Sequence, residues 1–269
     1  MHKAGGAVPL TSERLRVLHL ITRLELGGAQ RNTLATCHGL DPSRFDAHLA
    51  YGPGGMLDNQ VRCAFSPLPA LQRAVCPVRD LRALRQIRAL LASWRPHVLH
   101  THSSKAGILG RWAARSFPQI RVVHTVHGFA FPLDGSGGGG GRLYRFLEGL
   151  AARWTDRLVF VSREDMAFAA ARGWCPRGRV LIRSGFPLGD YRPCPERRQE
   201  QRRRFGIPED ALVCGVVAPF KPQKGLMHMV KVVRHLKKMA GRPFRVLVAG
   251  DGALRSELER WLCEAGVRD

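Results

Sequence analysis

The chain has 269 residues, of which 45% are hydrophobic and 24% are charged, a composition typical of a globular protein. No apolar run approaches the roughly 20 residues that a membrane helix needs, and the first residues lack the apolar core of a signal peptide. We therefore expect a cytoplasmic protein. The seven Cys residues include no Cys-x-x-Cys pair, which argues against a zinc site and against a disulfide framework.

The net charge of +22 arises from 43 Lys and Arg residues against 21 acidic ones. Such a surface attracts polyanions, including nucleic acids, anionic lipid headgroups and phosphorylated substrates. The charge is spread along the chain, with one dense run at 197–204. The alternative to a surface that binds polyanions is a helix face whose charges are simply solvated. No helix-turn-helix, zinc or RNA-recognition signature accompanies the charge, so nucleic-acid binding has no other support.

Residues 1–15 are expected to be a disordered lead-in. The apolar run 16–22 (RVLHLIT) predicts a strand, followed by the turn Gly27-Gly28 and a helix that ends near residue 40. A glycine turn between a strand and a helix suits a bound phosphate, because the ligand can approach the backbone and the free N–H groups of the helix. The pattern is not G-x-G-x-x-G, and a simple tight turn is the alternative.

Strands are also predicted at 45–51 and 97–101, with a helix at 80–94 between them. The strand at 97–101 ends in HTHSSKAG, which opens a helix that ends near residue 116. The loop carries His102 and Lys105 and is interpreted as ligand-facing. A helix-capping Ser at 103 or 104 would explain part of it without a function.

The stretch 122–129 (VVHTVHGF) is predicted to be a buried parallel strand that carries His127 to the carboxyl edge of a sheet. In open α/β sheets that edge binds ligands, although a lone histidine at a strand end can also be structural. His100, His102, His124 and His127 could together bind a metal ion. No carboxylate accompanies them, so no metal site is expected.

The segment 129–141, which includes the glycine run 137–141, is predicted to be a mobile loop that would either fold over an acceptor or serve as an inert linker. A helix at 142–154, a strand at 157–161, a helix capped by Ser162 and a strand at 179–182 follow. The Pro- and Arg-rich segment 188–205 is expected to be a linker between an N-terminal domain, 16–187, and a second unit, 206–269.

The second unit repeats the alternation of strands and helices, with strands at 212–217 and 244–249. Lys221 and Lys224 precede its first helix. Two lysines beside free helix N–H groups suit a diphosphate, and a basic turn is the alternative.

Together, these motifs resemble the family-four glycosyltransferases, from residue 16 to the end. The motifs are GGAQ at 27–30, HTHSSKAG at 100–107, HTVHGF at 124–129, VSRED at 161–165, IRSGF at 182–186, KPQKG at 221–225 and AGDG at 249–252. The resemblance implies a GT-B-like α/β fold. Its two Rossmann-like domains would face each other across a cleft, the first binding the acceptor and the second a nucleotide-sugar. It further implies retention of configuration and no metal or other cofactor.

The resemblance also implies roles for single residues. Gly27 and Gly28 would contact donor phosphates, and Lys224 would pair with the diphosphate. His127 would lie by the reacting sugar, with no protein nucleophile. His102 and Lys105 would line the acceptor side.

Two departures from the family pattern are visible. Pro219 stands where the family usually has an Arg, so we expect Lys221 to supply that charge. The family's two glutamates eight positions apart are absent, since Glu257 and Glu264 are seven apart. The donor domain is therefore expected to be truncated, with an exposed apolar sheet edge and impaired activity.

The sequence thus predicts a glycosyltransferase acting on a glycan or lipid-linked acceptor, peripherally in contact with anionic membrane. The alternative is a non-catalytic binder of a polyanionic or lipid-linked ligand.

Overall fold

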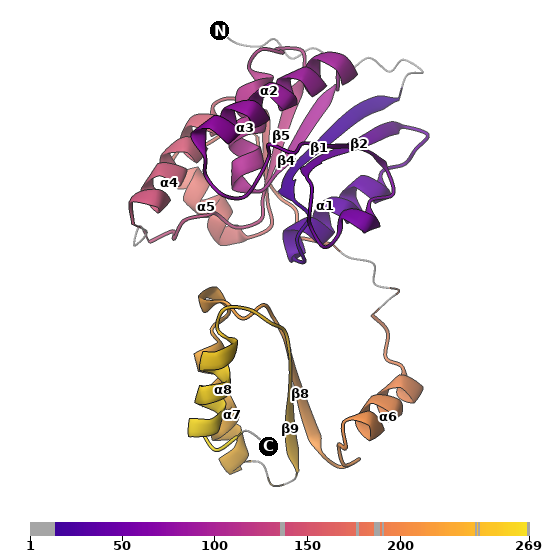
Figure 1. Cartoon of the computed structure of the whole chain (residues 1–269), viewed down its shortest axis with the longest axis vertical. Helices are drawn as coiled ribbons and strands as arrows, with labels where there is room; N and C mark the ends of the chain where they lie inside the picture. The colour runs from indigo at the N-terminus through magenta and orange to yellow at the C-terminus, as the bar shows by residue number, and fades with distance from the viewer. Residues whose placement is uncertain are drawn as a thin grey trace. The chain divides into compact units, whose positions relative to one another are not determined.

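The structure is a computed structural model that describes residues 14–134, 138–175, 178–185, 189, 191–239, 241 and 243–267. The chain divides into two compact units, residues 1–187 and 188–269, which we describe separately (Figure 1). Residues 1–13 of the expected lead-in lie outside the described residues. Leu15, its last member, already belongs to the first strand.

The first unit is built on a parallel sheet with the strand order β3-β2-β1-β4-β5-β6-β7. Neighbours β1 and β4 mark the point where the strand order reverses. Such a switch point leaves a crevice outside the carboxyl ends of the two strands. The strands are β1 (Leu15–Arg23), β2 (Phe45–Gly52), β3 (Ala64–Pro67), β4 (Val98–His102), β5 (Arg121–Val126), β6 (Arg157–Phe160) and β7 (Arg179–Leu181).

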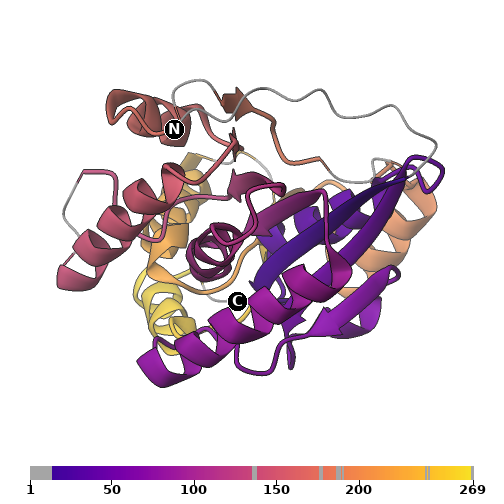
Figure 2. The same ribbon diagram turned by 90° about the horizontal axis from the view of Figure 1, so that it is seen from above.

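Alternate residues of β1 pack into two different cores. Leu18 and Leu20 belong to the core beneath α2 and α3, whereas Ile21 packs with Leu34 of α1. Since side chains alternate across a strand, α1 lies on the opposite face of the sheet from α2 and α3. The helices α2, α3 and α4 lie side by side (Figure 2). The helices of this unit are α1 (Gly28–Gly39), η1 (Asp58–Gln60), α2 (Pro77–Trp94), α3 (Ser104–Ala114), α4 (Gly139–Ala152) and α5 (Arg163–Ala171).

The structure corrects the expected loop at the glycine run. Gly137 lies outside the described residues, but Gly138 is the N-cap of α4 and Gly139–Gly141 form its first turn. A mobile loop at 139–141 was therefore a wrong prediction. Glycine is a poor helix former by about 1 kcal/mol per residue. The amphipathic remainder of α4 packs against α3, and this tertiary contact outweighs the local preference.

Other predicted elements need smaller corrections. The helix expected at 80–94 begins three residues earlier, with Pro77 in its first turn. Within this helix Leu84 and Ile87 are buried, whereas Leu81 is 48% exposed. The strand β3 was missed. The cap at Ser162 is confirmed, because its hydroxyl accepts hydrogen bonds from the N–H groups of Glu164 and Asp165.

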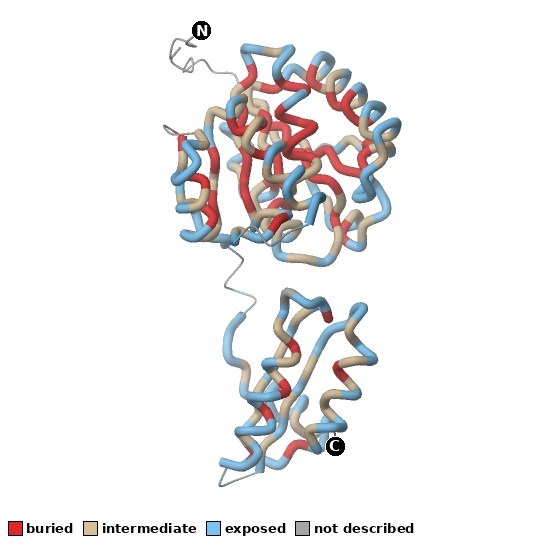
Figure 3. The backbone as a smooth tube through the Cα atoms, turned by 90° about the vertical axis from the view of Figure 1, so that its left-hand side faces the viewer, coloured by how far each residue is buried: buried red, intermediate tan, exposed pale blue. Residues whose placement is uncertain are grey.

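The second unit contains a parallel pair of strands, β8 (Leu212–Val217) and β9 (Phe244–Ala249). Its other elements are α6 (Pro195–Arg204), η3 (Pro222–Lys224), α7 (Leu226–Met239) and α8 (Arg255–Glu264). Much of the segment expected as a linker is therefore helical. Buried residues are denser along the strands of the first unit than in the second (Figure 3). None of the described helices is both long and apolar enough to cross a membrane.

Candidate active site

The loops that leave β1 and β4 are tied together at the switch point. Oγ1 of Thr22, near the end of β1, lies 2.8 Å from Oγ of Ser103, which follows β4. Ser103 Oγ also accepts a hydrogen bond from the Thr22 N–H at 3.2 Å, and Thr22 Oγ1 accepts one from Ala106 N–H at 3.1 Å. These contacts tie together two segments about 80 residues apart in sequence.

Ser103 does not cap α3 with its side chain, contrary to one interpretation of the sequence. It occupies the N-cap position, but its hydroxyl bonds to Thr22 and makes no capping bond. Its φ of +61° lies in the left-handed region, which costs a non-glycine residue on the order of 1–3 kcal/mol. Strain of this kind is concentrated at functional sites, so Ser103 adds to the case for a site at this edge.

Four histidines share the α1 face of the sheet at this edge. The β1–β4 register pairs His19 with His100, and His102 lies two residues further along β4 on the same face. Nδ1 of His19 lies 3.2 Å from Nε2 of His102, and Nδ1 of His102 lies 3.2 Å from Nε2 of His127. His100 Nε2 lies 2.7 Å from Oγ1 of Thr125. The structure thus brings together His102 and His127, two of the residues singled out in the sequence.

Burial keeps these imidazoles neutral at pH 7. Desolvation lowers the pKa of His19 and of His127 to about 4. It also lowers the pKa values of His100 and His102 well below 6.5, with a further contribution from neighbouring imidazoles. A neutral imidazole offers one donor and one acceptor, so the cluster can orient a polar ligand without adding charge.

His124 lies on the opposite face of the sheet. Its Nδ1 is 2.9 Å from Oγ1 of Thr101, and burial, then the guanidinium of Arg111, hold its pKa well below 6.5. Arg111 is fully buried and pairs with Glu148 of α4 at 2.5 Å. His124 therefore belongs to the core beneath α3 and not to the crevice.

A metal ion at this edge would be bound by His19, His100 and His102, and not by the four histidines that the sequence suggested. One nitrogen from each of these three lies within 4.8 Å of the others. Both nitrogens of His102 already lie within hydrogen-bonding distance of other imidazoles, and His100 bonds to Thr125. An ion at this place would have to displace those bonds.

Gly27 and Gly28 lie at the start of α1, at the same carboxyl edge. Gly27 is the N-cap and makes no side-chain capping bond, and Gly28 has open space where a Cβ would stand. The first turn of α1 contains no acidic residue. Its N–H groups and positive dipole end can thus serve an anion, although no described contact assigns one.

Lys105 lies on α3, and its ammonium is engaged away from the histidines. Nζ forms an ion pair with Asp80 of α2 at 2.6 Å and donates hydrogen bonds to the carbonyl oxygens of Gln72 and Ala74. The side chain is only 10% exposed. These contacts anchor α2 to α3, and a role on the acceptor side stays a prediction.

Lys221 and Lys224 lie in the second unit, where the loops after β8 and β9 pack together. Phe220 N–H donates to Asp251 O, and Leu254 N–H donates to Phe220 O. Lys221 precedes η3 and Lys224 ends it, and both side chains are exposed. Phe220 thus ties the segment that carries both lysines to the turn at 250–252.

The sequence reasoning missed His19 and Thr22. His19 is the middle residue of β1. It shares the parity of Ile21, which indicates the face of the sheet on which it lies but not the residue that it contacts. Its contact with His102 depends on β1 lying next to β4, which local patterns do not reveal.

A family model described as "Glycosyl transferase 4-like domain" matches residues 27–185. A UDP-Gal:alpha-D-GlcNAc-diphosphoundecaprenol alpha-1,3-galactosyltransferase of Escherichia coli is 30% identical over 256 residues, covering 93% of this chain and 65% of that protein. A putative glycosyltransferase, EpsD, of Bacillus subtilis (strain 168) is 26% identical over 190 residues, covering 68% and 49%. The chain therefore spans about two thirds or less of the length of these relatives.

Solved structures share the fold at low identity. Anabaena Alr3699/HepE in complex with UDP-glucose superposes with a TM-score of 0.75 at 16% identity, covering 95% of this chain and 67% of that one. Sucrose-phosphate synthase from Thermosynechococcus elongatus gives a TM-score of 0.70 at 15% identity, covering 94% and 68%. The predicted α/β fold of the glycosyltransferases is confirmed.

The family model covers more than half of the chain, and the curated relatives extend the match over most of it. The resemblance inferred from the motifs is confirmed: the chain belongs to the glycosyl transferase 4-like family.

Proposed function

We propose that this protein transfers a hexose from a uridine diphosphate sugar to a lipid-linked glycan acceptor, with retention of configuration. The observation that carries the proposal is the carboxyl edge of the sheet at the switch point, which holds both the glycine-started helix α1 and a cluster of neutral histidines. The family supports glycosyl transfer, and the UDP-bound neighbours and the E. coli relative's lipid-linked acceptor support the two substrate classes.

The site suggests a mechanism based on positioning. The bond between the anomeric carbon and the diphosphate breaks while the acceptor oxygen bonds to the same face, and the acceptor's proton passes to the departing diphosphate. No nucleophilic carboxylate among the described residues bonds to His102 or His127. Neutral imidazole at position 127 would hold sugar hydroxyls, and the N–H groups at the start of α1 would stabilise the leaving charge.

Replacing Lys224 or Lys221 by Ala is expected to weaken UDP binding by roughly tenfold or more. A charge-assisted hydrogen bond contributes about 1.5–3 kcal/mol, and both lysine side chains are exposed. Isothermal titration with UDP measures the dissociation constant. Lys231→Ala, an exposed lysine on α7, is the matched control and should bind as the wild type does. Equal affinities for all variants would remove the lysines from the site.

Release of sugar from UDP-galactose and UDP-glucose distinguishes transfer from mere binding. A chain that binds UDP but neither hydrolyses nor transfers sugar would favour the non-catalytic binder. A lipid-linked acceptor also requires access to a membrane, and we propose peripheral contact at its cytoplasmic face.

The outward face of α4 has the composition for that contact. We use "the α4 surface" for Arg142, Leu143, Arg145, Phe146 and Arg153. Leu143 is 55% exposed and Phe146 is 66% exposed. The only acid in α4 is the buried, paired Glu148, so its exposed charge is entirely positive. Exposed apolar groups beside arginines are the two features by which an interfacial helix binds anionic lipid.

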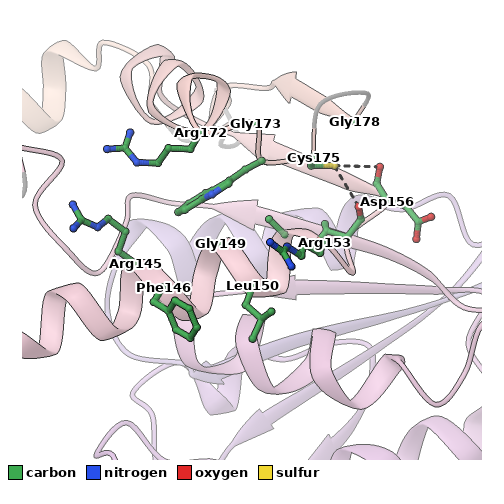
Figure 4. A pocket seen from close by; sticks show the side chains of 13 residues that line it. Arg145, Phe146, Gly149, Leu150, Arg153, Asp156, Arg172, Gly173, Cys175 and Gly178 are labelled. Carbon is green, nitrogen blue, oxygen red and sulfur yellow. Dashed lines mark hydrogen bonds between the residues drawn. The ribbon is translucent and has the colours of Figure 1, made fainter. Parts of the chain in front are cut away.

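A hollow of about 1060 Å³ continues this surface toward α5 and β7 (Figure 4). Arg145, Arg153 and Arg172 line it together with Phe146 and Trp174. The hollow contacts Asp156 and Gly178, which directly precede β6 and β7. It therefore lies at the amino edge of the sheet, whereas the histidines lie toward the carboxyl edge. Arginines beside aromatic rings can receive a lipid phosphate while leaving the crevice free.

The double variant Arg145→Gln/Arg153→Gln is expected to bind vesicles of phosphatidylglycerol about 30-fold more weakly, since each basic residue near an anionic surface contributes about 1 kcal/mol. Co-sedimentation measures the partition coefficient, and vesicles of phosphatidylcholine should bind neither protein well. The control is Arg198→Gln/Arg203→Gln, with the same change in charge on α6, where both arginines are exposed. An equal loss in the control would mean that only the overall charge drives binding.

A further inference from the structure

Three imidazoles form a linked row from the core to the crevice. Its two contacts, His19 Nδ1 with His102 Nε2 and His102 Nδ1 with His127 Nε2, are each 3.2 Å. The ring planes of adjacent members are inclined by 17° and 30°, and the ring centroids of both pairs are 5.5 Å apart. His19 and His102 are 1% exposed, and His127 forms the half-buried end of the row.

A row of neutral imidazoles can carry its protons in only two ways. Each ring has one N–H and one bare nitrogen, so both contacts must donate in the same direction. If His127 donates to His102 and His102 to His19, all three protons are on Nε2. If His19 donates to His102 and His102 to His127, all three are on Nδ1.

The inner end of the row distinguishes the two directions. Nε2 of His19 is buried and has no hydrogen-bond partner in the described part of the chain. In the first direction it would be a buried N–H without an acceptor, and in the second it is only a bare lone pair. Buried N–H groups without acceptors are the rarer of the two in folded proteins. The second direction is therefore favoured.

We propose that His19 and His102 are positioning residues that hold His127 as the tautomer with its proton on Nδ1. Within the described residues, no protein atom bonds to Nδ1 of His127, so that N–H is the donor available to a ligand. An oxygen of the donor sugar would accept it, a role that rests on the proposed function. The row thereby makes His127 offer a ligand an uncharged hydrogen-bond donor, and not an acceptor.

The tautomers can be measured by long-range proton–nitrogen correlation spectra of protein labelled with nitrogen-15 histidine at pH 7.5. In the wild type, His19, His102 and His127 are expected to share the Nδ1–H pattern. His19→Leu removes the first donor, and His127 is expected to become a mixture of tautomers. His19→Asn keeps an N–H group near the position of Nδ1 and is expected to restore the wild-type pattern at His127.

His48→Asn is the control, because His48 lies outside the row and bonds to Ser66 at 2.8 Å. It should leave the spectrum of His127 unchanged. An Nε2–H pattern for His127 in the wild type would overturn the proposal, and this result needs no variant to fold. A tautomer pattern at His127 that is the same in the wild type and in His19→Leu would also overturn the proposal. The measurement uses no substrate, so a failed proposal for glycosyl transfer would leave its result intact.

Discussion

Lowering the pH from 7 to 5 is expected to destabilise the first unit by at least about 4 kcal/mol. Burial lowers the pKa of His19 and of His127 to about 4, from 6.5 in the unfolded chain. The folded state therefore binds fewer protons than the unfolded state. The stability is fully present above pH 6.5 and is lost as the pH falls from 6.5 toward 4, by about 2 kcal/mol per histidine at pH 5.

His100, His102 and His124, whose pKa values are also lowered by burial, act in the same direction. Because whole domains are stable by only about 5–15 kcal/mol, the first unit is expected to be near unfolding at pH 5. Denaturant titrations followed by circular dichroism at pH 8, 7, 6 and 5 measure the effect. The slope of the unfolding free energy against pH counts the protons taken up.

His19→Asn removes one of these groups and should reduce proton uptake by about one, while lowering stability at pH 8. His228→Asn, an exposed residue on α7, should leave the pH dependence unchanged. If the unfolding free energy differs by less than about 1 kcal/mol between pH 7 and pH 5, the histidines are not buried as described.

Replacing Glu148 by Leu is expected to cost about 3–5 kcal/mol of stability, the usual loss when one partner of a buried ion pair is removed. Arg111 is fully buried, and its Nε donates to the carbonyl oxygen of Gly107 at 2.8 Å while Nη2 pairs with Glu148. Without the carboxylate, the guanidinium stays in the core between α3 and α4 with its charge uncompensated. Thermal and denaturant unfolding measure the loss.

The double variant Arg111→Met/Glu148→Leu is expected to recover most of that stability, because apolar groups of similar volume often replace a buried pair without loss. The contrasting surface pair is Arg260 with Glu264, 3.9 Å apart and about two thirds exposed. Arg260→Ala should change stability by less than about 1 kcal/mol. A Glu148→Leu variant as stable as the wild type would show that Arg111 reaches solvent.

Local patterns in the sequence determined much of this protein. The alternation of apolar strands with amphipathic helices, the glycine turn at Gly27-Gly28 and the motif HTVHGF led to the α/β fold and to the family. His102 and His127 could be selected because each stands at the end of an apolar strand. These signals lie within a few residues of each other, where backbone preference and side-chain period act.

The tertiary structure decided which of these residues meet. His19 reaches His102, 83 positions later, only because β1 pairs with β4 at the switch point. Lys105 could have faced the crevice, but Asp80 holds it between α2 and α3. Glycines 139–141 have little helix preference of their own. They are helical because they form the first turn of α4, which packs on α3. Strand order and helix packing depend on contacts distant in sequence, which residue types and spacing do not specify.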